Sequence, residues 1–143
     1  MLSSILRLSS AAVLLVASAA CGPAPTQPSH FSAFQQTDLR LGTGTEAAAG
    51  NTLSVDYTLW LYNATAPDNK GPLLDSSLGT EPFSFVLGRG DTIRGWDQGL
   101  VGMRAGGLRR LVIPPSLAYG RSRSGLVPPN ATLVFEVELL TVE

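Results

Sequence analysis

Two phenylalanines and a tryptophan have the side-chain type and spacing to build an apolar binding hollow. Phe83 and Phe85 lie two residues apart, so both rings leave the same face of an extended strand, which is expected to end at Gly88 and Gly90. Trp96 follows this turn and can face the two rings across it. Three such rings can wall a rigid, dry concavity that receives a ligand. The alternative is that they are ordinary core packing.

A short helix is expected to position Trp96. Asp91 and Thr92 are favourable N-cap residues. The apolar residues after them recur at i, i+3, i+7 and i+8: Ile93, Trp96, Leu100 and Val101. This spacing predicts an amphipathic helix with all four side chains on its buried face.

The sequence excludes several kinds of catalysis. The single histidine, His30, precedes the predicted domain, so that domain can hold no Ser-His-Asp triad, histidine base or His-based metal cluster. No Walker loop or GxGxxG fingerprint is present. The basic residues are scattered except for Arg109 and Arg110, which argues against a nucleic-acid partner. An enzyme of this sequence would work without metal, cofactor or covalent intermediate.

Residues 1–20 have the layout of a secretory signal peptide. One charge, Arg7, precedes an apolar and small-residue run that ends at Ala20. The run is shorter than the ~20 apolar residues of a membrane-spanning helix. We therefore expect export, and a domain that begins after this segment.

Cys21 is the only cysteine and directly follows the signal-like segment. The run SAAC resembles the cleavage box of bacterial lipoproteins, which implies a lipid on Cys21 and a membrane anchor, although Ser18 stands where an aliphatic residue is usual. The alternative is ordinary cleavage after Ala20 and a soluble periplasmic or secreted protein. Residues 21–34 are rich in Pro, Ser, Ala and Gln and predict a flexible tether.

Residues 35–143 read as a single, mostly β domain. Apolar and polar residues alternate in several segments, and residues 133–139 place Glu136 and Glu138 opposite the apolar side chains. With the helix, five strands joined by loops predict an α+β antiparallel sheet covered on one face. The strands are expected at residues 36–41, 52–61, 83–87, 108–113 and 132–142. The turn-rich segment 63–74 is expected to form a surface flap or a bulged hairpin end.

Four motifs together resemble the FKBP-type peptidyl-prolyl cis/trans isomerases. PFSFVLG, IRGW, LAYG and VPPNATLVFEVELL occur in the order of that family, and the likeness extends from about Gln35 to the end of the sequence. The resemblance implies a five-stranded twisted antiparallel sheet wrapped around one short helix, and prolyl isomerisation without a cofactor. The implied partners are proline-containing polypeptides and macrolide inhibitors of the tacrolimus and rapamycin type.

The resemblance also implies roles for individual residues. Trp96 would be the floor under the proline ring, and the backbone N–H of Ile93 would bind a carbonyl beside it. Tyr119 would donate to a substrate carbonyl, and Asp75 would accept a hydrogen bond from Tyr57 at the rim. The remaining implied contacts are Phe83, Phe85, Phe135, Leu74, Thr92, Leu126 and Val127.

Two positions leave alternatives open. Asp75 precedes two serines, and such an aspartate is often only a turn former or a helix cap. Leu74 stands where the family has an aromatic residue.

The expected function is an exported, lipid-anchored isomerase acting on folding chains in the bacterial cell envelope. A non-catalytic peptide-binding or chaperone module on the same fold is the main alternative, and a purely structural lipoprotein domain is the third.

Overall fold

The structure is a computed structural model that describes residues 32–143. The predicted signal peptide, the lipidation of Cys21 and most of the tether lie outside the described residues. Phe34, the last residue of the predicted tether, packs against the hydrophobic core. The folded part therefore begins slightly before the first strand.

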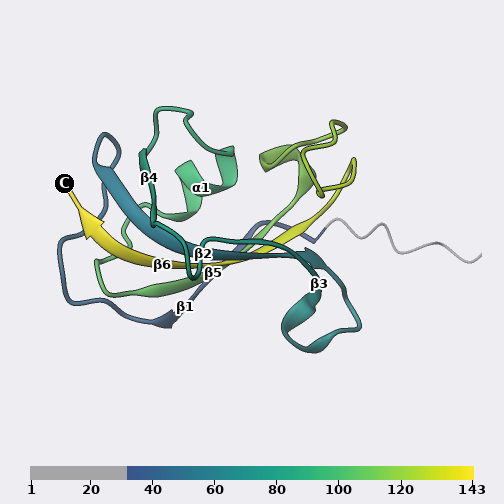
Figure 1. Cartoon of the computed structure of the whole chain (residues 1–143), viewed down its shortest axis with the longest axis horizontal. Coiled ribbons are helices and arrows are strands. Elements are labelled where there is room, and N and C mark those ends of the chain that lie inside the picture. Colours follow the sequence, from purple (N-terminus) through teal and green to yellow (C-terminus); the bar gives the residue numbers. More distant parts are fainter. Residues whose placement is uncertain (1–31) are drawn as a thin grey trace, which may run out of the picture.

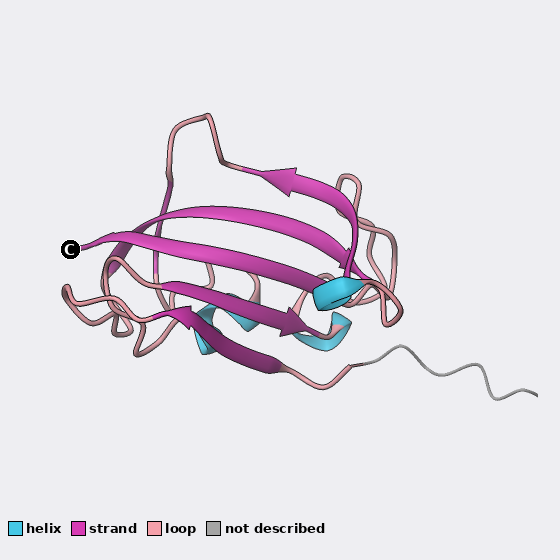
Figure 2. Cartoon of the chain, turned by 90° about the horizontal axis from the view of Figure 1, so that it is seen from below, coloured by secondary structure: helices cyan, strands magenta, loops and turns pink. Residues whose placement is uncertain are grey.

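Six antiparallel strands form one twisted sheet in the order β1-β5-β6-β2-β3, and β4 pairs with the rest of the β2 edge (Figures 1 and 2). The strands are β1 (Gln35–Arg40), β2 (Thr52–Tyr62), β3 (Lys70–Ser76), β4 (Phe83–Val86), β5 (Leu108–Ile113) and β6 (Leu133–Val142). All five predicted strands are present. The sheet curves around one short helix, α1 (Arg94–Gly99), as the resemblance implied (Figure 1).

The core lies between the concave face of the sheet and α1. Alternate residues of β6, from Leu133 to Leu139, are almost fully buried, while Glu136 and Glu138 point to the other face. The β2 residues Leu53 and Val55 pair with Val142 and Leu139 of β6, on either side of a register shift, and are also buried. The period-two pattern therefore predicted correctly which face of the central strands is covered.

The sixth strand, β3, arises from the segment expected to be a flap or a bulged hairpin end. A 3-10 turn at Pro67–Asn69 reverses the chain, and β3 then pairs with β2 through a register that shifts twice. Lys70 holds the start of β3 to the face of the sheet that carries Glu136. Its Nζ lies 4.4 Å from the centroid of the Trp60 ring and 2.6 Å from Glu136 Oε1. The bulged-hairpin alternative is the correct one.

The predicted cap of α1 is wrong. Ile93 is the N-cap, and no side chain caps the helix. Asp91 instead accepts a hydrogen bond from the backbone N–H of Val86. Val101, expected on the buried face, is 46% exposed because α1 ends at Gly99 and the chain has already turned.

Two glycines allow α1 to lie directly on β5. A Cβ atom on Gly95 would come 2.5 Å from Ile113 Cγ2, and one on Gly99 would come 2.8 Å from Leu111 Cδ2. Contacts this short do not occur between real side chains, so any larger residue would push the helix away. The glycine pair sets the depth at which Trp96 sits.

Arg109 fastens the C-terminal end of α1 to the sheet edge. Its guanidinium donates to both carboxylate oxygens of Asp38 on β1, at 2.6 and 3.1 Å, and to the carbonyl oxygens of Gly99 and Val101. The side chain is only 7% exposed. A buried guanidinium needs such a full set of acceptors.

Candidate active site

A cavity of about 180 Å³ opens between the sheet, α1 and the loop that follows β5. Its walls are mainly aromatic and its rim carries a few polar groups. The lining residues are Tyr57, Leu59, Asp75, Phe83, Asp91, Thr92, Ile93, Trp96, Tyr119 and Phe135. The structure thus brings together, around one hollow, most of the residues that the sequence assigned to the site.

Trp96 forms the floor of this hollow. The rings of Tyr57, Phe83 and Phe135 stand nearly perpendicular to the indole, at interplanar angles of 77°, 72° and 76°. Their centroids lie 5.5, 6.1 and 5.3 Å from it, within the range of edge-to-face packing. Each ring fixes its neighbour, so the apolar surface is rigid before any ligand arrives.

Phe85 supports the wall from behind. Its ring stacks on Phe83 at 5.7 Å and lies 5.4 Å from Trp96, but the side chain is only 5% exposed and does not line the hollow. The two phenylalanines share a strand face, as their spacing predicted, yet Phe83 alone reaches the ligand space. Phe85 acts by holding the other two rings.

A hydrogen bond joins Tyr57 to Asp75 at the polar edge. The Tyr57 hydroxyl donates to Asp75 Oδ2 at 2.7 Å, and the Ser76 backbone N–H donates to Asp75 Oδ1 at 2.8 Å. Burial and then the bond to the carboxylate raise the pKa of Tyr57 to about 12. Asp75 lies within β3, so it is neither a turn former nor a helix cap.

Tyr119 offers a free phenol at the opposite rim. It follows the 3-10 turn Pro115–Leu117, and the next residue, Gly120, has a φ of +59° that turns the chain sharply. Its side chain is 37% exposed, and no described residue forms a hydrogen bond with its hydroxyl. It can therefore donate to a ligand.

Further polar groups without a partner belong to residues at the start of α1 that line the hollow. As the N-cap, Ile93 has no intrahelical acceptor for its backbone N–H, and none of the described residues accepts from it. The Trp96 Nε1 and Thr92 Oγ1 atoms are also buried without a partner in the described part of the chain. The site thus holds several polar groups whose hydrogen bonds are not yet made.

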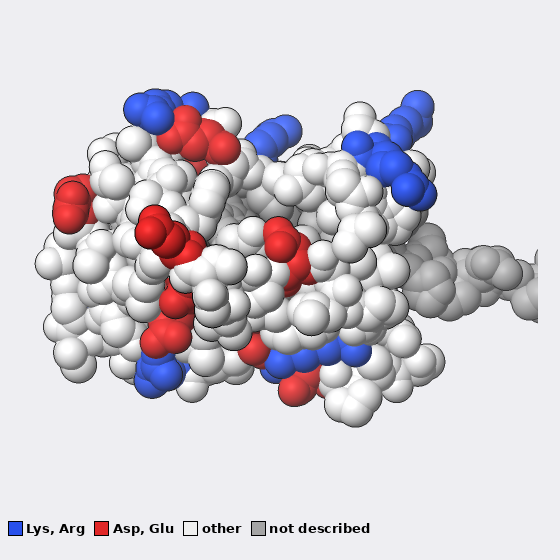
Figure 3. Space-filling view, viewed as in Figure 1, with Lys and Arg blue, Asp and Glu red and all other residues white. Residues whose placement is uncertain are grey.

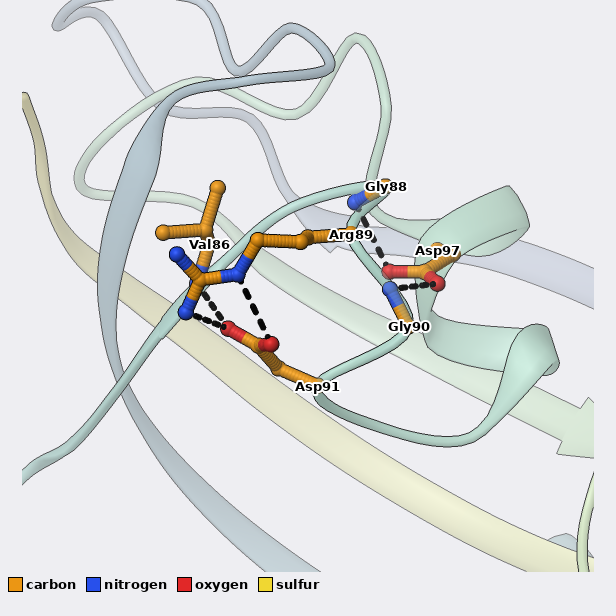
Figure 4. A network of polar contacts seen from close by, with 6 residues as sticks. All are labelled: Val86, Gly88, Arg89, Gly90, Asp91 and Asp97. Atoms are coloured by element: carbon orange, nitrogen blue, oxygen red, sulfur yellow. Dashed lines mark hydrogen bonds and ion pairs between the residues drawn. The ribbon is translucent and has the colours of Figure 1, made fainter.

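Two aspartates that the sequence reasoning assigned no such role hold the loop before α1 (Figure 4). The Asp97 carboxylate on α1 accepts from the backbone N–H groups of Gly88 and Gly90, at 2.8 and 3.2 Å. Asp91 binds the Arg89 guanidinium through both oxygens, and this pairing lowers the pKa of Asp91. These bonds fix the loop that presents Thr92 and Ile93. In the sequence, only the glycines at positions 88 and 90 pointed to a special turn here, and in the structure both have a φ near +80°.

A second hollow of about 350 Å³ adjoins the first and shares Leu59, Asp75 and Tyr119 with it. Leu74, Leu126 and Val127 line it. Leu126 is 74% exposed, whereas Val127 is 6% exposed and belongs to the core cluster. Of the predicted lip, Leu126 forms the outer part and Val127 the base.

Residues 32–143 contain neither a metal-binding cluster nor a helix that could span a membrane. No group of three or more His, Cys, Asp or Glu side chains in that range is arranged to hold a metal ion. No helix in the same range is long and apolar enough to cross a membrane.

Comparison with known proteins identifies the family. The model of the FKBP-type peptidyl-prolyl cis-trans isomerases matches residues 43–140, so this chain belongs to that family. Its members are rotamases, which catalyse rotation about the peptide bond that precedes proline.

The relatives agree with this assignment. The chain is 48% identical over 107 residues to an "FK506-binding protein" of Neisseria meningitidis serogroup A, which covers 73% of this chain and 92% of the relative. It is 53% identical over 97 residues to "FK506-binding protein 2B" of Rhizopus delemar, covering 66% of this chain and 44% of that one. The crystal structure of AtFKBP13 superposes with a TM-score of 0.64 at 33% identity, over 77% of this chain and 93% of that one.

Proposed function

We propose that this peptidyl-prolyl isomerase accelerates the folding of proline-containing polypeptides in the bacterial cell envelope, where a lipid on Cys21 anchors it. The isomerase chemistry follows from the family and the hollow. The proposed location is supported by the sequence of residues 1–21, namely the signal-like segment and the run SAAC.

The chemistry requires a dry surface and fixed donors. Rotation about an X-Pro bond crosses a barrier of about 20 kcal/mol and passes through a twisted amide. The twisted amide has lost its resonance and is less dipolar than the planar one, so a site that excludes water favours the transition state over the ground state. Each ~1.4 kcal/mol of this preference gives a tenfold increase in rate.

One observation carries the proposal. Ile93 and Tyr119 line the same aromatic hollow, and neither the Ile93 N–H nor the Tyr119 hydroxyl has a partner among the described residues. A proline ring on the Trp96 indole would place the neighbouring carbonyls between these two donors. The donors would hold the chain on both sides while the bond between them rotates.

A protease-coupled Xaa-Pro peptide assay on residues 22–143 tests this function. The parent should accelerate isomerisation, and Tyr119→Phe should lower kcat/KM by about tenfold, the effect of one lost hydrogen bond of ~1.4 kcal/mol. Trp96→Ala should also lower it, with a loss of stability that thermal unfolding will measure separately. A folded parent that leaves the uncatalysed rate unchanged contradicts the proposal.

A non-catalytic peptide-binding or chaperone module is the second candidate. It is favoured by Leu74, which makes one wall aliphatic, and by the exposed Leu126 beside it. In that case the folded parent would suppress aggregation of an unfolded client without changing the isomerisation rate. Measuring both properties on the same preparation separates the two candidates.

Binding of macrolides is a further part of the proposal. The relatives' name, "FK506-binding protein", describes those proteins, and the hollow offers this chain similar aromatic walls and donors. FK506 should therefore inhibit the peptide assay competitively. Failure of saturating FK506 to change kcat/KM would remove this part and leave the isomerase proposal intact.

The anchor has its own test. Mass spectrometry of the membrane fraction should find acyl chains on Cys21, and Cys21→Ser should release the protein into the soluble fraction. An unmodified, soluble parent would exclude the anchor and favour simple cleavage after Ala20.

A further inference from the structure

Three arginines are set apart from the other basic residues of the described chain. Six of the nine Lys and Arg side chains in residues 32–143 are in ion pairs: Arg40, Lys70, Arg89, Arg104, Arg109 and Arg110. Arg94, Arg121 and Arg123 are exposed and have no ion pair or hydrogen bond with any described residue. Residues 1–31 contain no Asp or Glu that could pair with them.

All three unpaired arginines lie within two residues, along the chain, of residues that line the two adjoining hollows. Arg94 directly follows Ile93 at the start of α1. Arg121 comes two residues after Tyr119, and Arg123 precedes Ser124, which lines the adjoining hollow. Figure 3 shows basic side chains standing out from the region of α1 and from the loop after β5, on opposite sides of the recess between them. A peptide lying across the hollow would pass between these two groups of charge.

The carboxylates that line the hollow offset only part of this charge. Asp91 is paired with Arg89, whereas Asp75, which accepts hydrogen bonds from Tyr57 and Ser76, has no ion pair with a described residue and leaves one negative charge against the three arginines. The floor and walls beneath the rim are aromatic. The guanidinium groups can therefore act on residues before and after the proline, while the proline ring itself meets an uncharged surface.

We propose that Arg94, Arg121 and Arg123 select substrates that carry acidic side chains beside the X-Pro bond. This inference rests on the proposed isomerase function and adds a substrate class to it. An unpaired guanidinium matches the fork geometry of a carboxylate. Exposed pairs are individually weak, so the three arginines should mainly raise the rate of productive encounter and lower KM.

A matched peptide series tests the selection. The peptides share one Xaa-Pro core and carry Glu, Gln or Lys two residues before and two residues after it. We expect kcat/KM to fall in the order Glu, Gln, Lys, with about a three- to tenfold span at low salt. The span should shrink at ~0.3 M salt, where the Debye length is shorter than about 8 Å.

Variants assign the preference to these residues. In the triple variant Arg94→Gln, Arg121→Gln and Arg123→Gln, the ratio of the Glu to the Lys peptide should fall to about one. The control Arg104→Gln removes one positive charge, as each of the three substitutions does, but from the ion pair with Glu46, away from the hollow. It should keep the ratio of the Glu to the Lys peptide. Equal rates for the three peptides in the parent, or a ratio that survives the triple substitution, would overturn the inference. So would an equal loss of the ratio in the Arg104→Gln control.

The test also separates this inference from the isomerase proposal. If no peptide of the series is isomerised faster, the isomerase function fails by itself. The same peptides are then titrated against the intrinsic fluorescence of Trp60 and Trp96. Tighter binding of the Glu peptide would still support selection by the arginines, and equal affinities would refute it.

Discussion

The Tyr57 hydroxyl and Asp75 Oδ2, 2.7 Å apart, join strands β2 and β3 at the rim of the aromatic hollow. Because the Tyr57 hydroxyl already donates its proton to the Asp75 carboxylate, Tyr119 is the tyrosine of the hollow whose hydroxyl is still free to donate. The two tyrosines therefore have different tasks. Tyr57 orients Asp75 and walls the hollow, while Tyr119 keeps a hydroxyl that is free to donate to a substrate.

Raised pH should expose the Tyr57 contribution to stability. Its pKa is about 12 in the folded chain and about 10 when unfolded, so the stabilisation is complete below pH 10 and is lost as the pH rises toward 12. We expect the parent to lose more free energy of unfolding over this window than Tyr57→Phe. Denaturant titrations at several pH values, with absorbance at 295 nm to follow the phenolates, measure it. Parallel curves for the two proteins would contradict the prediction.

Removal of the Asp97 carboxylate should loosen the loop before α1. Asp97→Ala leaves the N–H groups of Gly88 and Gly90 without their acceptor, at a cost of about 1–2 kcal/mol. Because this loop presents Ile93, kcat/KM should also fall several-fold. Glu81→Ala removes the same charge from an exposed residue whose side chain forms no hydrogen bond or ion pair with the rest of the described chain. Equal behaviour of the two variants would show that only net charge matters.

Gly95→Ala should destabilise the protein although alanine favours helices. The new methyl group would meet Ile113 at 2.5 Å, and overpacking of this kind costs about 1–3 kcal/mol. Helix propensity alone predicts a gain of about 1 kcal/mol, so the sign of the change is diagnostic. Chemical denaturation measures it. Gln98→Ala, at an exposed position of the same helix, should be neutral or slightly stabilising.

Arg109→Met should be the most destabilising of these substitutions. It leaves Asp38 and two backbone carbonyls without their donor. We expect a loss of about 3 kcal/mol, the lower end for a broken buried pair, because the Asp38 side chain is 36% exposed and water can reach it. Arg104→Met breaks an exposed pair and should change the free energy of unfolding by less than about 1 kcal/mol. Similar losses in both variants would refute the buried role.

Strand positions were predictable because alternation reports burial directly. Leu133, Phe135 and Val137 reveal the covered face of β6 without any long-range information. Strand β3 was harder to recognise because Gly71 and Pro72 interrupt its pattern, and its pairing depends on register shifts in the hairpin.

The details of the site depend on contacts between distant residues, which local propensity does not encode. Asp91 is a good N-cap by type, but Arg89 and Val86 bind its carboxylate instead. Phe85 has an aromatic side chain of the type that binds ligands, yet the Phe83 ring stacks over it. The resemblance to the family supplied eight of the ten residues that line the hollow and missed Leu59 and Asp91. The structure supplied the distinction between residues that line it and residues that support it.

The order in which the chain is synthesised bears on when this catalyst can work. Phe135, which completes the hollow, belongs to β6, and β6 lies between β5 and β2 at the middle of the sheet. A ribosome adds this strand after all the other walls, so a nascent chain that ends before it has neither the central strand nor a working hollow. The enzyme therefore cannot assist its own prolines in cis during translation, and any help must come from molecules already finished.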